Sequence, residues 1–252
     1  METKNAASNF SDEKTPIKEQ EMKLIWILSW SWPEAGLAIT QEMHEYLQWE
    51  YNAVDDLDYP DYILYNKPLR GFWVTWIEQP ELVEEDFISS MKKLDSMWAE
   101  IIWIACNTLH WLLDKVEDQL DAKVINMIHE TCNSIWDKDN VLVLCSASTT
   151  KMGMYEKYLK DVLKKENVLT LSWENQDKID EVIESAMGWN QWQAEIDAVN
   201  TVISSYESEW SLDAVILGCT ELPLAYSQKD SNLYVTSSNN VLAKTLVEEA
   251  KK

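Results

Sequence analysis

Two stretches of the sequence, EIIWIACNTL (residues 100–109) and DAVILGCTEL (residues 213–222), have the same layout. Each begins with an acidic residue and continues as an apolar run of strand length. A small residue, a cysteine, polar residues and a leucine follow. A short apolar run of this kind is typical of a strand buried on both faces. Each cysteine therefore stands where a strand ends and the next helix begins, and the repetition predicts a chain built of two similar halves.

Strand-like and helix-like segments alternate along the rest of the chain. The predicted strands are Leu24–Leu28, Tyr62–Tyr65, Ile101–Ala105, Val124–Met127, Val141–Cys145, Val168–Leu171, Ala214–Gly218 and Leu233–Val235. The predicted helices are Pro33–Leu47, Glu84–Met97, Leu109–Gln119, Met154–Lys165, Gln176–Met187 and Gln193–Tyr206. Such alternation is typical of βαβ units. We therefore expect an α/β fold of mostly parallel sheets flanked by helices, with the site at the carboxyl ends of the strands.

The bulk composition narrows the classes of function. The net charge of −23 over 252 residues argues against nucleic-acid binding, because that function needs a basic footprint. No apolar run approaches the ~20 residues of a membrane span. Residues 1–21 are polar and lack the apolar core of a signal peptide. We expect a cytoplasmic protein without nucleic-acid or membrane partners, in which residues 1–21 form a disordered extension.

The cysteines carry the chemistry that the sequence suggests. Cys106, Cys132, Cys145 and Cys219 show no CxxC spacing, so we expect free thiols. Simple burial in the core is the alternative interpretation of the cysteines at the two matching strand ends. A helix N-terminus lowers the pKa of a thiol. Two such thiols facing each other across a cleft could take a proton from a carbon and return one to its opposite face, without a cofactor.

The motifs IACNTLH (residues 104–110) and LGCTELPLA (residues 217–225) resemble the paired signatures of the aspartate/glutamate racemase family. The resemblance extends from Met22 to about Ala250. It implies cofactor-independent racemisation of an acidic amino acid, aspartate or glutamate, by Cys106 and Cys219.

The resemblance also implies a domain organisation. We expect two pseudo-symmetric α/β domains with the active site in the cleft between them. The first would span residues 22–122 and be completed by residues 233–252, and the second would span residues 123–232. A homodimer is left open.

Further substrate contacts are implied by the family motifs. The residues expected to contact the substrate are Ser31, Arg70, Asn107, Thr108, Thr149, Thr220 and Glu221. Thr149 lies in STTKMGMY (residues 148–155), where Ser148 replaces a usual glycine. Arg70, the chain's single arginine, lies in YNKPLRGF (residues 65–72). Its planar guanidinium suits a substrate carboxylate, and a surface charge is the alternative.

Other cofactors and functions are less consistent with the sequence. His44, His110 and His129 are not at metal-ligand spacing, and no lysine has a context that suggests a pyridoxal Schiff base. We therefore expect neither metal nor cofactor. The alternatives are a hydantoin racemase, a maleate isomerase-like enzyme, and a catalytically inactive protein that binds a small molecule.

The tryptophans are distributed unusually. The chain has 14 tryptophans and 5 glycines, whereas glycine at about 7% of an ordinary chain would give roughly 18. The stretch IWILSWSWPEA (residues 25–35) is similar to the family pattern IGILGGMGPEA. The tryptophans at glycine positions of the family pattern are Trp26, Trp30, Trp32, Trp76 and Trp98. We interpret them as UGA codons that the organism reads as glycine and that a different genetic code translates as tryptophan. A divergent protein with an aromatic-lined pocket is the alternative.

Overall fold

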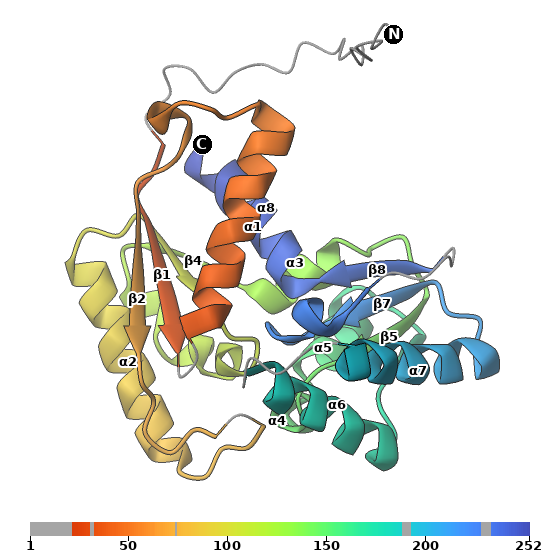
Figure 1. Ribbon diagram of the computed structural model, residues 1–252. Helices are drawn as coiled ribbons and strands as arrows, with labels where there is room; N and C mark the ends of the chain where they lie inside the picture. Colours follow the sequence, from red (N-terminus) through yellow and green to blue (C-terminus); the bar gives the residue numbers. More distant parts are fainter. Residues whose placement is uncertain (1–21, 31–32, 74, 188–192, 228–232) are drawn as a thin grey trace, which may run out of the picture.

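Two parallel sheets form the framework of the protein. The structure, a computed structural model, describes residues 22–30, 33–73, 75–187, 193–227 and 233–252 (Figure 1). The first sheet has the order β2-β1-β3-β4 and the second has the order β6-β5-β7-β8. The strands are β1 (Ile25–Trp30), β2 (Tyr62–Lys67), β3 (Ile101–Ile104), β4 (Lys123–Ile125), β5 (Asn140–Leu144), β6 (Asn167–Leu169), β7 (Ala214–Leu217) and β8 (Tyr234–Ser237). Every predicted strand overlaps one of these, with ends that differ by up to two residues. The α/β fold of two similar halves is confirmed.

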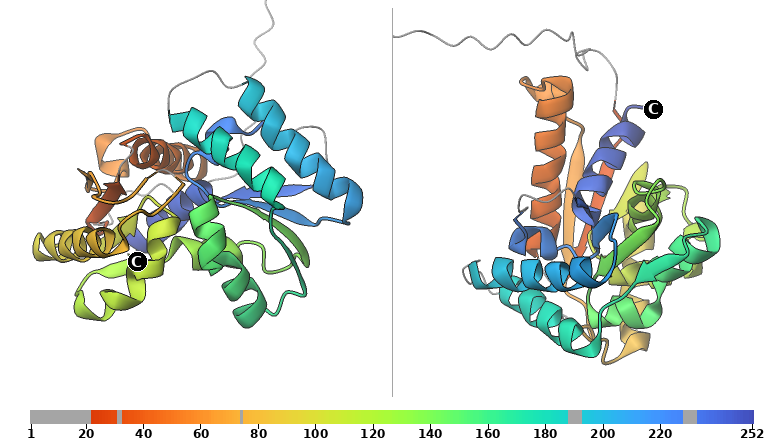
Figure 2. Two further views of the ribbon diagram at one scale, coloured as in Figure 1. Left: turned by 90° about the horizontal axis from the view of Figure 1, so that it is seen from below. Right: turned by 90° about the vertical axis from the view of Figure 1, so that its right-hand side faces the viewer.

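Helices cover both faces of each sheet. The α-helices are α1 (Pro33–Tyr51), α2 (Pro80–Ser96), α3 (Met127–Asn133), α4 (Ala147–Met152), α5 (Met154–Lys157), α6 (Trp173–Met187), α7 (Gln193–Glu209) and α8 (Ser238–Ala250). On the second sheet, α6 and α7 share one core with strand residues, and α3 and α5 share the other (Figure 2). None of the described helices is long and apolar enough to cross a membrane.

Strand β1 shows how the sequence pattern produces the first sheet. Successive side chains of a strand point to opposite faces. Accordingly, Ile25 and Ile27 join the core under α1 and α8, whereas Trp26, Leu28 and Trp30 join the core under α2. All six residues of β1 are buried, so the strand presents apolar side chains to both layers of helices.

The predicted domain boundaries each need a correction of a few residues. Residues 123–125 form β4, which pairs with β3 of the first sheet. Residues 234–237 form β8, which pairs with β7 of the second sheet, so only α8 of the segment 233–252 packs on the first core. In each half the short last strand extends its own sheet, because its backbone hydrogen bonds pair there.

Two predicted helices differ from the observed structure. Residues 109–119 form two 3₁₀ segments, Thr108–Lys115 and Glu117–Gln119. Residues 154–165 form the short α5, followed by a π-helical turn at Tyr158–Val162. Apolar spacing over one or two turns does not distinguish these helix types, because their periods are similar over so few residues.

Candidate active site

The two expected thiols lie at equivalent ends of the two sheets. Cys106 comes shortly after β3 and Cys219 shortly after β7. In the first sheet β3 lies next to β1, and in the second sheet β7 lies next to β5. The two strands therefore have the same place in the repeated strand order. Both cysteines line a single cavity between the halves, and both are partly accessible. The layout that the two motifs share thus brings a thiol from each half to one cavity.

The cavity is small. Its volume is about 40 Å³, which is room for roughly one or two water molecules. Apolar walls are contributed by Trp30 at the end of β1, by Phe72 in the loop after β2, and by Ile183 and Met187 on α6. The entry of an amino acid therefore requires these walls to separate, or the bulk of one of them to be absent.

Cys219 is hydrogen bonded to an acid. Its Sγ donates to Oε2 of Glu221 at 2.9 Å, and Oγ1 of Thr220 donates to the same oxygen at 2.9 Å. Burial raises the pKa of Glu221. Burial also raises the pKa of Cys219, and the charges of Glu221 and Cys106 raise it further. The hydrogen bond places Glu221 to accept the thiol proton, while the raised pKa of Cys219 keeps the thiol protonated in this structure.

Cys106 lies at the start of the 3₁₀ segment. Burial raises its pKa to about 12, although hydrogen bonds from the backbone N–H groups of Leu109 and Thr108 lower it. The expectation of thiols with lowered pKa was therefore wrong for both cysteines in this structure. The N–H groups at the helix start lower the pKa of Cys106, as expected. Removing the thiolate from water raises that pKa by more than these groups lower it.

A close approach holds the second motif in place. A Cβ at Gly218 would lie 2.7 Å from Cε2 of Tyr155 and 3.0 Å from its Cζ. Only glycine allows the buried tyrosine ring to lie against the strand end that carries Cys219. The Tyr155 hydroxyl in turn donates to Oδ1 of Asn107 at 2.6 Å, so one tyrosine links the two cysteine motifs.

The expected polar residues of the first motif are already partnered. Nδ2 of Asn107 donates to Oγ of Ser238 at 3.0 Å. Oγ1 of Thr108 lies 2.8 Å from Oγ1 of Thr149, and Ser146 lies 3.1 Å from that same hydroxyl. Asn107, Thr108 and Ser146 line the cavity. Thr149 is not among the residues that line the cavity. Its hydroxyl contacts those of Thr108 and Ser146, which do line it.

Arg70 is not at the cavity in the structure. Its Nε and Nη2 donate to Asp86, at 3.0 Å to Oδ2 and 2.9 Å to Oδ1, and Nη2 also donates to Glu85 at 3.1 Å. The same pairing lowers the pKa of Asp86. The guanidinium of Arg70 therefore pairs with α2 in this structure, and its expected contact with a substrate carboxylate stays a prediction. What reaches the cavity from this loop is Phe72.

A substitution distinguishes these two roles of Arg70. Arg70→Lys keeps the charge but loses the planar fork on Asp86, so we expect a lower midpoint of thermal unfolding and an unchanged KM. Glu85→Gln removes only the exposed partner and should leave both quantities unchanged. A clear rise in KM at an unchanged midpoint of thermal unfolding would show instead that Arg70 binds the substrate.

Some residues that line the cavity were not predicted from the sequence. Some predicted residues lie outside the part of the chain that the structure describes. Sequence reasoning did not identify Ser146, Phe72, Ile183 or Met187. Ser146 had a signal, because a serine after a buried strand is a typical helix N-cap, and it caps α4 here. The two α6 residues are spaced i, i+4 like any buried helix face. Ser31 and Trp32 lie outside the described residues.

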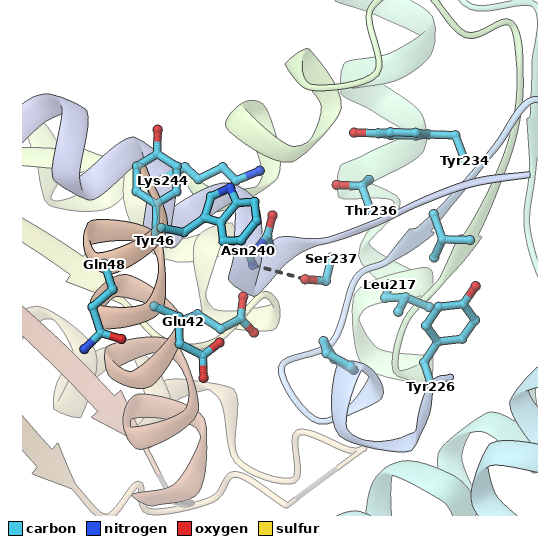
Figure 3. Close-up of a pocket in the computed structure, with 14 residues that line it drawn as sticks. Glu42, Tyr46, Gln48, Leu217, Tyr226, Tyr234, Thr236, Ser237, Asn240 and Lys244 are labelled. Carbon is cyan, nitrogen blue, oxygen red and sulfur yellow. Dashed lines mark hydrogen bonds between the residues drawn. The ribbon is translucent and has the colours of Figure 1, made fainter. Parts of the chain in front are cut away.

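A larger groove lies elsewhere between the halves. Its volume is about 900 Å³, and its walls include Glu42 and Tyr46 of α1, Thr236 of β8 and Asn240 of α8 (Figure 3). Burial raises the pKa of Glu42 to about 7. Among the described residues that line this groove there is no thiol and no histidine. The small cavity, with its paired thiols, is therefore the better candidate for the chemistry.

Comparison with known proteins places this geometry in a family. The model of the family described as Asp/Glu/Hydantoin racemase matches residues 31–246. The chain belongs to that family. The protein is therefore an amino-acid racemase, a kind of isomerase, and the suspected resemblance is confirmed.

Individual relatives agree with this assignment. The "Broad specificity amino-acid racemase RacX" of Bacillus subtilis (strain 168) is 24% identical over 229 residues, which are 89% of this chain and 96% of that protein. The structure is similar to an aspartate racemase homologue from Pyrococcus horikoshii OT3, with a TM-score of 0.74, 26% identity, and 92% and 100% of the two chains covered. The structure is also similar to Picrophilus torridus aspartate racemase, with a TM-score of 0.73 and 26% identity. The match covers 90% of this chain and 94% of that one.

Proposed function

We propose that the protein racemises a free amino acid with two thiols and no cofactor. The observation that carries the proposal is that Cys106 and Cys219 follow equivalent strands of the two sheets and line one cavity. A carbon held between two thiols can lose a proton to one and gain a proton from the other, which inverts its configuration. The names of the Bacillus subtilis and Picrophilus torridus relatives support racemisation of an amino acid.

The proposed steps follow from the hydrogen bonds. In one direction, Glu221 takes the thiol proton of Cys219 and the resulting thiolate removes the Cα proton. The electron pair of the broken C–H bond stays on the substrate as a carbanion next to its carboxylate. The Cys106 thiol then gives its proton to the opposite face. Cys106 is then a thiolate and Glu221 holds a proton, so transfer of a proton from Glu221 to Cys106 by way of solvent restores the starting state. In the reverse direction the Cys106 thiolate removes the Cα proton and the Cys219 thiol supplies the new one.

Independence from cofactors has a direct test. Racemisation of L-amino acids, followed by chiral chromatography, should persist after treatment with EDTA and exhaustive dialysis. The purified protein should show no absorbance of bound pyridoxal. A requirement for added metal or pyridoxal phosphate would overturn the two-thiol proposal.

We also propose that the tryptophans at family glycine positions are glycines in the natural protein. Trp98 has a φ of +63°, a conformation that favours glycine. Trp26 and Trp30 are buried, and their indole Nε1 atoms have no hydrogen-bond partner in the described part of the chain. Trp30 also lines the cavity that contains the two thiols. Trp76 is 53% exposed and gives no structural support by itself.

A further inference from the structure

We infer that the substrate carries an uncharged, apolar side chain, of the methionine or leucine class, rather than a second carboxylate. The inference rests on the proposed function and specifies its substrate. It departs from the acidic substrate that the family resemblance implies, and it is argued from the walls and charges of the thiol cavity.

The walls of the cavity beyond the thiols are apolar. Phe72 enters from the loop after β2, and Ile183 and Met187 enter from one face of α6. Ala35, at the start of α1, completes this surface. These four residues come from three separate elements in both halves of the chain, so the apolar surface is a property of the assembled site. None of these four residues is one of the tryptophans that we propose to be glycine.

The charge at the cavity has the wrong sign for an acidic side chain. Among the described residues that line it, the only charged side chain is Glu221. A second substrate carboxylate would be buried without a cation, which is costly, and would face another acid. A cationic side chain would have to compete for Glu221 with Cys219 and Thr220, which both donate to its Oε2. An apolar side chain meets neither difficulty.

The basic residues closest to the site in sequence are bound elsewhere. The side chains of Arg70 and Lys67 both pair with Asp86, and Lys178 pairs with Glu174. In the tryptophan chain, Nζ of Lys151 lies 4.8 Å from the ring centroid of Trp76, a contact that the glycine chain would lack. Three short segments lie close in the sequence to cavity residues but outside the part of the chain that the structure describes: 31–32, 74 and 188–192. Their sequences, SW, V and GWNQW, contain no lysine or arginine.

A substrate panel tests the inference and separates it from the proposed function. Loss of the Cα proton signal in D₂O is followed by NMR for L-leucine, L-methionine, L-aspartate, L-glutamate and L-lysine, with both the tryptophan chain and the glycine chain. We expect kcat/KM for leucine and methionine to exceed that for the charged substrates by about tenfold or more. Faster exchange of a charged amino acid would overturn the inference and leave the proposed function standing. Exchange of no amino acid would overturn both.

Placing a cation in the cavity should reverse the preference. Phe72 is only partly buried, so Phe72→Arg should fold, and it should raise kcat/KM for aspartate or glutamate relative to leucine by about tenfold or more. Phe72→Gln is the matched uncharged control and should lower leucine turnover without this gain. Met187→Lys places a cation on the α6 wall and should have the same effect as the arginine. An unchanged ratio in both cationic variants, with folding confirmed by circular dichroism, would contradict the assignment of these walls to the substrate side chain.

Discussion

Replacing either Cys106 or Cys219 by alanine should abolish racemisation while the fold is retained. Each substitution removes the proton transfer on one face of the substrate, and one remaining thiol cannot invert the carbon. Positioned acid–base groups contribute about 10²–10⁴-fold each, so we expect kcat to fall at least this far in either variant. Chiral chromatography of the product measures the loss, and circular dichroism checks the fold.

The chain offers a matched control for these variants. Cys145 also follows a strand, β5, and burial raises its pKa to about 12, but its Sγ lies 3.2 Å from Oγ1 of Thr150 and it does not line the cavity. Cys145→Ala should therefore keep most of the activity. Substantial racemisation by Cys106→Ala or Cys219→Ala would remove the two-thiol mechanism.

Changing Trp26, Trp30, Trp32, Trp76 and Trp98 together to glycine should restore both solubility and racemase activity. Overpacking costs typically about 1–3 kcal/mol per site, and a non-glycine residue at positive φ costs a similar amount. Several such sites could consume an ordinary stability of about 5–15 kcal/mol. The tryptophan chain should accordingly express poorly or be inactive. Parallel expression and chiral assay of the two genes compare them.

A control and a sequence check sharpen this prediction. Trp173 is 90% exposed and Trp136 is 73% exposed, so changing these two residues alone to glycine should restore nothing. The codons provide an independent check, since the proposal requires UGA at the five positions. UGG codons there, or equal activity of the tryptophan chain, would show that the indoles belong to the protein.

The fold was predictable because its strands are short buried runs bounded by polar residues. The paired motifs also predicted which residues meet. Cys106, Asn107 and Thr108 lie with Cys219, Thr220 and Glu221 around one cavity, although the two groups are far apart in the sequence.

What sequence reasoning missed depends on three-dimensional neighbours. The guanidinium of Arg70 binds Asp86, which lies 16 residues further on in α2. The raised pKa of Cys106 follows from burial, which outweighs the N–H groups at the start of its 3₁₀ segment. Ile183 and Met187 line the cavity, but their spacing is that of any core-facing helix. Ion pairing and desolvation depend on residues that are distant in the sequence, so a local sequence pattern does not predict them.

Racemisation in D₂O tests the two-thiol mechanism most directly. A protiated L-amino acid is sampled at low conversion, and mass spectrometry reports deuterium at Cα in the separated L and D forms. Two thiols on opposite faces predict that nearly all of the newly formed D product carries solvent deuterium, while the remaining L substrate stays largely protiated. A D product that retains the substrate's own proton would mean that a single base returns it, and would contradict the assignment of Cys106 and Cys219 as the acid–base pair.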